Sequence, residues 1–104
     1  RPDEARLVKA KHDIKTLQGA LEMYKLHNST FPSTEQGLQA LVTQPSGEPE
    51  ANNWQGYMPK LPKDPWGNDY NYRSPGENAI YDLYSLGQDN MEGGEDENED
   101  IVSW

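Results

Sequence analysis

The residues of this chain best suited to chemistry are carboxylates concentrated near its C-terminus. Residues 89–100 contain seven acidic side chains and no basic one. Carboxylates crowded into one short segment repel each other, and a bound divalent cation removes that repulsion. Calcium matches this donor set best because it takes about six to eight oxygen ligands, from carboxylates and backbone carbonyls, in a flexible geometry. The acidic residues are Asp89, Glu92, Glu95, Asp96, Glu97, Glu99 and Asp100.

A solvated acidic tail is the alternative interpretation of the same segment, because blocks of like charge are usually solvated. The apolar residues Ile101, Val102 and Trp104 follow the block and favour a loop that returns to the body of the domain. An EF-hand is a poor match, since Met91 and Gly93 stand where its loop needs oxygen ligands. From the residues alone, a calcium loop of another type and an acidic tail both stay open.

Other site chemistries find little support in the sequence. His12 and His27 are fifteen residues apart on a predicted helix, which separates their rings by ~22 Å and excludes a joint site. The chain has no cysteine, and it contains no nucleophile elbow, zinc-protease motif or glycine-rich phosphate loop. We therefore predict that the protein is not an enzyme. The formal net charge of −9 also argues against binding to nucleic acid.

The elements that must hold the acidic segment belong to one small domain. The chain has 104 residues, of which 33% are hydrophobic, so it can build only a thin core. No apolar run reaches the ~18 residues of a membrane span.

A long helix is predicted at the N-terminus, ending near residues 27 and 28. Its apolar side chains recur at alternating steps of three and four residues, as on one face of an amphipathic helix. The pattern fits packing against a core or a seam for self-assembly, and both remain open. The stripe consists of Leu7, Ala10, Ile14, Leu17, Leu21 and Tyr24, and we expect Val8, Ala20, Met23 and Leu26 to widen it.

The next segment is predicted to form a short helix and a loop. Ser33 and Gln36 have the spacing of a capping box, and Leu38, Leu41 and Val42 supply one apolar face after it. Prolines, glycines and polar residues then mark a loop over residues 45–56. We expect Trp54, Tyr57 and Met58 to pin this loop to the domain.

A turn and an antiparallel hairpin are predicted over residues 61–85. Two prolines and a Gly-Asn pair make residues 61–69 a turn, and strands follow at residues 70–73 and 79–85. A two-stranded ribbon is only marginally stable alone, so it should pack on the long helix. The expected contacts bury Leu17, Leu21 and Tyr24 under Tyr72, Tyr81 and Leu83, which defines an α+β fold.

Three blocks of sequence resemble the major pseudopilins, the G subunits of the bacterial type II secretion system. Together they extend over essentially the whole chain, and their order is specific. The first block is Met23-Tyr24-Lys25-Leu26 with Asn28, Pro32, Thr34, Gln36-Gly37-Leu38 and Ala40-Leu41; the second runs from Leu61 to Tyr70; the third is Ser85-Leu86-Gly87 with Asp89, Gly93-Gly94 and Asp100-Ile101.

The resemblance implies a type IV pilin-like fold, with a long N-terminal α-helix packed on a small antiparallel β-sheet and a C-terminal calcium-binding loop. The single domain would span 1–104, with the end of the helical spine at 1–28, a short helix and loop at 29–60, a turn and hairpin at 61–85, and the calcium loop and C-terminal anchor at 86–104. Members of the family begin with a hydrophobic helix in the inner membrane. Because the predicted helix starts without a strong cap, we expect such a segment upstream of residue 1 in the native protein.

The resemblance also implies which residues bind calcium. Asp89 and Asp100 match the family pattern and are assigned as carboxylate ligands. Leu86 and Met91 are assigned as backbone-carbonyl ligands, and Asp96 as a further candidate.

The function implied is that of a structural subunit which polymerises into the periplasmic pseudopilus and drives export of folded proteins across the outer membrane. Its implied partners are copies of itself, minor pseudopilins, the inner-membrane assembly platform and, for the precursor, a prepilin peptidase that also methylates the new N-terminus. A minor pseudopilin and a monomeric periplasmic calcium-binding or adaptor domain are the alternatives. The domain is expected in the periplasm, anchored to the inner membrane.

Overall fold

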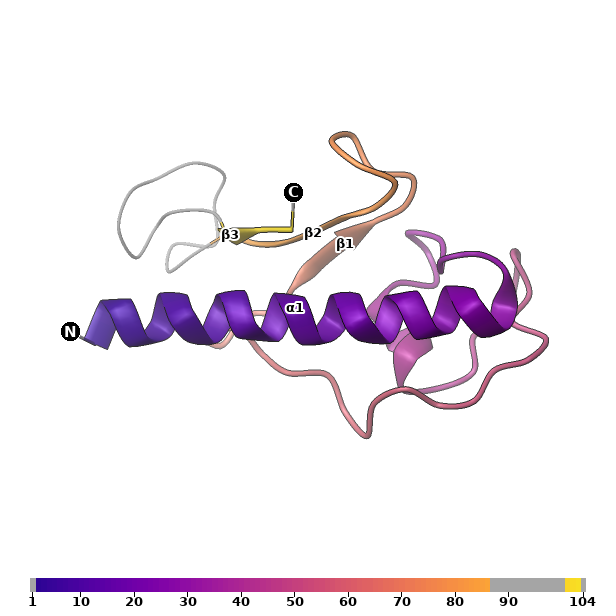
Figure 1. Ribbon diagram of the computed structural model, residues 1–104, viewed down its shortest axis with the longest axis horizontal. Helices are drawn as coiled ribbons and strands as arrows, with labels where there is room; N and C mark the ends of the chain where they lie inside the picture. The colour runs from indigo at the N-terminus through magenta and orange to yellow at the C-terminus, as the bar shows by residue number, and fades with distance from the viewer. Residues whose placement is uncertain (1, 87–100, 104) are drawn as a thin grey trace.

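The computed structural model describes residues 2–86 and 101–103. Its elements are the helix α1 (Pro2–Asn28), the 3-10 helix η1 (Leu38–Leu41) and the strands β1 (Asn71–Arg73), β2 (Asp82–Ser85) and β3 (Ile101–Val102). Helix α1 runs along the longest axis, the sheet lies on one side of it, and the segment between α1 and β1 wraps around its C-terminal half (Figure 1). The sheet and this segment therefore share the helix as a common support.

The predicted apolar stripe of α1 is confirmed as its buried side. Ala10, Ile14, Leu17, Leu21 and Tyr24 are all at most 3% exposed, and Leu7 and Ala20 pack against the core they form. The helix ends at Asn28, as predicted, and its last turn is closed by a bond from the amide of Ser29 to the carbonyl of Lys25.

The prediction that Val8, Met23 and Leu26 widen this stripe is wrong. These side chains are 66%, 46% and 72% exposed, respectively. Val8 and Leu26 are separated by about five helical turns and so share one side, whereas Leu17 lies midway between them and faces the opposite way. We call this solvent-facing side of the helix the exposed strip; it carries Val8 near one end and Met23 and Leu26 near the other, with the exposed polar residues His12 and Lys15 between them.

The capping box forms, but the helix predicted after it is shorter than expected. The amide of Gln36 donates to Ser33 Oγ at 3.1 Å, and the amide of Ser33 donates to Gln36 Oε1 at 2.9 Å. Gly37 then adopts a φ of 64°, in the left-handed region, which stops the turn before a regular helix can grow. The chain restarts as η1, which buries Leu38, Ala40 and Leu41.

The predicted antiparallel hairpin is confirmed and gains a third strand. Tyr72 of β1 lies opposite Leu83 of β2, and Ser85 of β2 lies opposite Ile101 of β3, so the sheet order is β1-β2-β3. The expected return of the chain after the acidic segment is thus confirmed for Ile101 and Val102. The prediction that β2 starts at residue 79 is wrong, because the chain bends until Asp82 and leaves Ile80 69% exposed.

The core forms where the sheet covers α1. Leu17, Leu21 and Tyr24 belong to one buried cluster with Tyr81 and Leu83, as predicted. Tyr72 is only half-buried, yet it packs against this cluster, and its hydroxyl donates to the carbonyl of Pro32 at 2.6 Å. The loop before the turn is attached as expected: Trp54 Nε1 donates to the carbonyl of Ala40 at 2.7 Å, and the amides of Tyr57 and Met58 donate to the carbonyl of Leu41.

Candidate functional site

The candidate metal site begins where β2 and β3 separate. Ser85 and Ile101 form the last pair of the ladder, Leu86 follows Ser85 and is half-buried, and Asp100 precedes Ile101 in the chain. Asp89, Met91, Asp96 and Asp100 lie outside the described residues, so their assignment as ligands stays a prediction. Within residues 2–86 and 101–103, no group of three or more His, Cys, Asp or Glu side chains is placed to hold a metal ion.

The buried carboxylate of Asp64 contacts Ser85 at this end of β2. Asp64, which is 3% exposed, accepts hydrogen bonds at Oδ1 from the amides of Trp66 at 3.0 Å and Asn68 at 2.8 Å. Its other oxygen, Oδ2, accepts a bond from Ser85 Oγ at 2.9 Å. Asp64 thereby joins the turn over residues 61–69 to the end of β2. The sequence indicated the turn but not this connection.

A second buried carboxylate, Asp82, organises the turn between β1 and β2. It is 0% exposed and accepts bonds from Arg73 Nε at 2.8 Å and from the amides of Glu77 at 2.8 Å and Asn78 at 3.2 Å. Burial raises the pKa of its carboxyl, but the bonds from Arg73 and the two amides outweigh burial and leave that pKa below its ordinary value. A Cβ at Gly76 would come within 2.6 Å of Asp82 Oδ1, so the turn needs glycine there.

Sequence reasoning missed this role of Asp82. The signal that could have revealed it was a charged residue in the middle of the β-prone, aromatic run Ala-Ile-Tyr-Asp-Leu-Tyr. A charge in such a run requires partners if the strand is buried.

The two histidines lie in different surroundings, in agreement with the prediction that they form no joint site. His12 is exposed on α1. His27 Nδ1 lies 3.0 Å from the hydroxyl of Tyr57, which also accepts a bond from Asn28 Nδ2 at 3.1 Å. The side-chain oxygen of Asn28 in turn accepts a bond from the amide of Asn53 at 3.0 Å. This cluster attaches the loop over residues 45–58 to the end of α1, which is a structural role.

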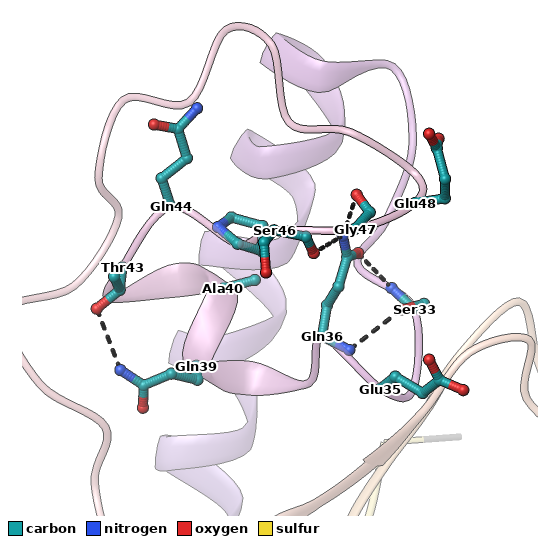
Figure 2. A pocket seen from close by; sticks show the side chains of 11 residues that line it. Ser33, Glu35, Gln36, Gln39, Ala40, Thr43, Gln44, Ser46, Gly47 and Glu48 are labelled. Carbon is teal, nitrogen blue, oxygen red and sulfur yellow. Dashed lines mark hydrogen bonds between the residues drawn. The ribbon is translucent and has the colours of Figure 1, made fainter.

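An open polar hollow of about 500 Å³ lies between η1 and the loop after it (Figure 2). The side-chain nitrogen Nε2 of Gln36 donates to the carbonyls of Ser46, Gly47 and Pro49 at 3.2, 3.3 and 2.9 Å. Gln39 donates to Thr43 Oγ1, as the dashed line in Figure 2 shows, and Gln44 donates to the carbonyl of Ala51. The amide groups of the hollow therefore serve to hold the surrounding chain in place.

These features define a fold class: an α+β domain in which a long helix supports a small antiparallel sheet, the arrangement that the resemblance to pseudopilins predicts. Comparison with known proteins agrees with that class. The family model "Type II secretion system (T2SS), protein G" matches residues 1–104. The chain therefore belongs to the type II secretion system protein G family, which confirms the resemblance seen in the sequence.

Individual relatives are similar over nearly the whole chain. The type II secretion system core protein G of Pseudomonas aeruginosa is 55% identical over 106 residues, which cover 100% of this chain and 75% of the relative. That of Vibrio cholerae is 52% identical over 104 residues, covering 98% of this chain and 70% of the relative.

Among solved structures, the major pseudopilin from the type 2 secretion system of enterohaemorrhagic Escherichia coli superimposes with a TM-score of 0.86. The two proteins are 42% identical, and the match covers 99% of this chain and 90% of that one. The predicted α+β, pilin-like fold is thereby confirmed. No helix among the described residues is sufficiently long and apolar to cross a membrane.

Proposed function

We propose that this protein is a non-enzymatic structural subunit that polymerises into the periplasmic pseudopilus of a type II secretion system and drives export of folded proteins across the outer membrane. The observation that carries the proposal is the likeness to a major pseudopilin over 99% of the chain, in sequence and in fold together. A likeness of this extent includes both α1 and the sheet.

The exposed strip of α1 supports assembly. Met23 and Leu26, three residues apart on the helix, leave neighbouring apolar side chains exposed on the side that faces away from the core of their own domain. Neighbouring exposed apolar side chains of this kind can contact another protein chain. In a polymer, copies of the same chain are the partners available at high local concentration.

The partners and location proposed follow from membership of the family. They are further copies of this chain, minor pseudopilins, the inner-membrane assembly platform and the prepilin peptidase that processes the precursor, with no nucleic acid. The domain is proposed to lie in the periplasm, anchored to the inner membrane. Digestion of spheroplasts with an added protease tests this placement, since a periplasmic domain is degraded while cytoplasmic proteins survive.

Calcium binding by the C-terminal loop is part of the proposal. The donor set is made entirely of oxygen, with carboxylates from Asp89, Asp100 and Asp96 and backbone carbonyls from Leu86 and Met91, which suits a hard cation such as Ca²⁺. Bound calcium would offset the mutual repulsion of the acidic segment. The pairing of Ser85 with Ile101 supports the proposal, because it attaches both ends of the segment to the same sheet.

Substitution on the exposed strip tests the proposed assembly in living cells. Leu26→Glu, in the full-length protein of a secreting bacterium, should abolish pseudopilus formation and secretion without reducing the amount of folded subunit, because Leu26 is 72% exposed. Asn52→Glu adds the same charge at an exposed loop position and serves as the control. Normal secretion by both Leu26→Glu and Val8→Glu would contradict a role of this strip in the polymer.

A further inference from the structure

We infer that the outer edge of β1 is a docking site for an extended, uncharged peptide segment of another protein, which would add one strand to the sheet. The inference depends neither on the polymer nor on the calcium site proposed above. It rests on the register of the sheet, on hydrogen-bonding groups of Tyr72 and Asn71 that lack partners, and on a hollow beside them.

The hydrogen bonds of Leu83 show which way the backbone of β1 faces. The carbonyl of Leu83 accepts a bond from the amide of Ser103 at 2.9 Å, and its amide donates to Ser103 Oγ at 3.1 Å, so both backbone groups of Leu83 point toward β3. Leu83 lies opposite Tyr72, and the pairs of an antiparallel ladder alternate between bonded and non-bonded. The amide and carbonyl of Tyr72 therefore point outward from β1, which is an edge strand of the sheet (Figure 1).

Ser74, two residues after Tyr72, agrees with this alternation and marks where the open edge ends. Its amide donates to Thr34 Oγ1 at 2.8 Å, and its carbonyl accepts from the same hydroxyl at 3.2 Å. The outward groups of Tyr72, in contrast, have no partner among residues 2–86 and 101–103. The side-chain nitrogen Nδ2 of Asn71 is buried and also has no acceptor in that part of the chain. Unpaired donors and acceptors at a sheet edge are a template for pairing with another chain.

The open edge lines a hollow of about 380 Å³, a volume typical of pockets that bind ligands. Residues 36–39, residues 61–62 and the buried side chain of Leu17 line it as well. Among the described residues that line it, Asp69 is the one with a charge, and it is paired with Lys63. This lining suits a peptide without charged side chains that directs an apolar side chain into the hollow.

A single extended chain suits this edge better than a second folded copy. Paired strands lie about 4.8 Å apart, and residues 36–39 and 61–62 flank the edge, so two folded copies are obstructed from bringing their β1 strands that close. An extended segment of a partner can enter the hollow and offer its own amide and carbonyl to Tyr72. Because Tyr72 is the one residue of β1 that points outward, few hydrogen bonds form, and we expect a dissociation constant of about 1 mM.

Hydrogen exchange of the 104-residue chain, followed by NMR, tests whether the edge is open. In the free chain, the amide of Tyr72 should exchange at least about tenfold faster than the amides of Asn71 and Arg73, which bond to β2. Equal protection of the three amides would overturn the inference, because the edge would already be covered. Protection of Tyr72 that rises with protein concentration would overturn it too, because the occupant would be a second copy.

The probe for binding is the uncharged pentapeptide acetyl-Thr-Val-Thr-Val-Thr-amide, whose residues favour an extended backbone. At about 10 mM, well above the expected dissociation constant, it should slow exchange of the Tyr72 amide and shift its resonance. An added strand pairs through one of its two edges. N-methylation of the two valines and of two threonines should therefore differ, one pattern abolishing binding and the other changing affinity by less than about threefold. No binding of the unmodified peptide, or equal effects of the two patterns, would refute the added strand.

A charge placed in the hollow tests where the peptide binds. Leu61→Glu should raise its dissociation constant by about tenfold or more, because the charge would lie against an apolar side chain. Met58→Glu makes the same change at another half-buried position outside the hollow and should alter the constant by less than about twofold. Unchanged affinity in a folded Leu61→Glu variant would place the peptide elsewhere and overturn the inference. If circular dichroism shows that Leu61→Glu does not fold, the two methylated peptides decide alone.

Discussion

Truncation of Leu21 to alanine measures how strongly α1 is held by the sheet. Leu21 is 0% exposed and belongs to the cluster beneath Tyr81 and Leu83. Removing three carbon groups from the core forfeits about 2.4 kcal/mol of transfer free energy. The cavity left behind brings the expected loss of unfolding free energy to about 3–4 kcal/mol, within the usual range for buried leucines. For a domain of this length, such a loss lowers the melting temperature by about 15 °C.

The matched control is Leu26→Ala, on the same helix and with the same chemical change. Leu26 is 72% exposed, so its truncation should cost less than about 0.5 kcal/mol, and the higher helix propensity of alanine offsets part of that. Urea denaturation followed by circular dichroism gives both values for the isolated chain. A loss below about 0.5 kcal/mol for Leu21→Ala, or equal losses for the two variants, would refute the assignment of the two sides of α1.

Three further predictions concern the polar residues. Saturating calcium, at about 100 times its dissociation constant, should stabilise the chain by about 2.7 kcal/mol in a thermal melt. Asp89→Ala or Asp100→Ala should remove most of that gain. If a chelator leaves the melting temperature of the unsubstituted chain unchanged, the segment is only an acidic tail. Because the pKa of Asp82 is lowered in the folded state, its contribution to stability is present at neutral pH and is lost as the pH falls below about 4. Asp82→Asn should therefore be less stable at pH 7, where Arg73 loses its anionic partner, and should show a shallower loss in acid denaturation. Gln36→Ala should cost roughly 1–2 kcal/mol and speed proteolytic cleavage between residues 44 and 51, because it releases three carbonyls of that loop.

Local chemistry was sufficient to predict several elements from the sequence. The spacing of Leu17, Leu21 and Tyr24 identifies the buried side of α1, because helical geometry alone decides which side chains share a face. The capping box of Ser33 and Gln36 forms as predicted, because its two bonds join residues three apart. Proline and glycine made the turn over residues 61–69 predictable for the same reason, since backbone preferences act within a few residues.

The tertiary structure decided which exposed and buried positions depart from these local patterns. Val8 and Leu26 are apolar, yet they face solvent because no element among residues 2–86 and 101–103 covers their side of α1. Ile80 and its neighbours have the β-propensity of a strand, but the carboxylate of Asp82 binds the amides of Glu77 and Asn78 and holds the chain in a turn. For Ile80, the hydrogen bonds of Asp82 outweigh a β-propensity that is worth at most about 1 kcal/mol. For Val8 and Leu26, the apolar pattern is not satisfied because no described element covers them.

For the proposed metal site, the sequence by itself determined the donor chemistry: a run of carboxylates followed by apolar residues, in a family whose members the chain resembles. Only the tertiary structure brought Asp64 within hydrogen-bonding distance of Ser85, and only the register of β2 with β3 placed Ser85 opposite Ile101. These arrangements join residues 21 and 16 positions apart, so they depend on the path of the intervening turns and on the packing of the sheet against α1. Residue types and spacing carry no information on such distances until the core has fixed that path.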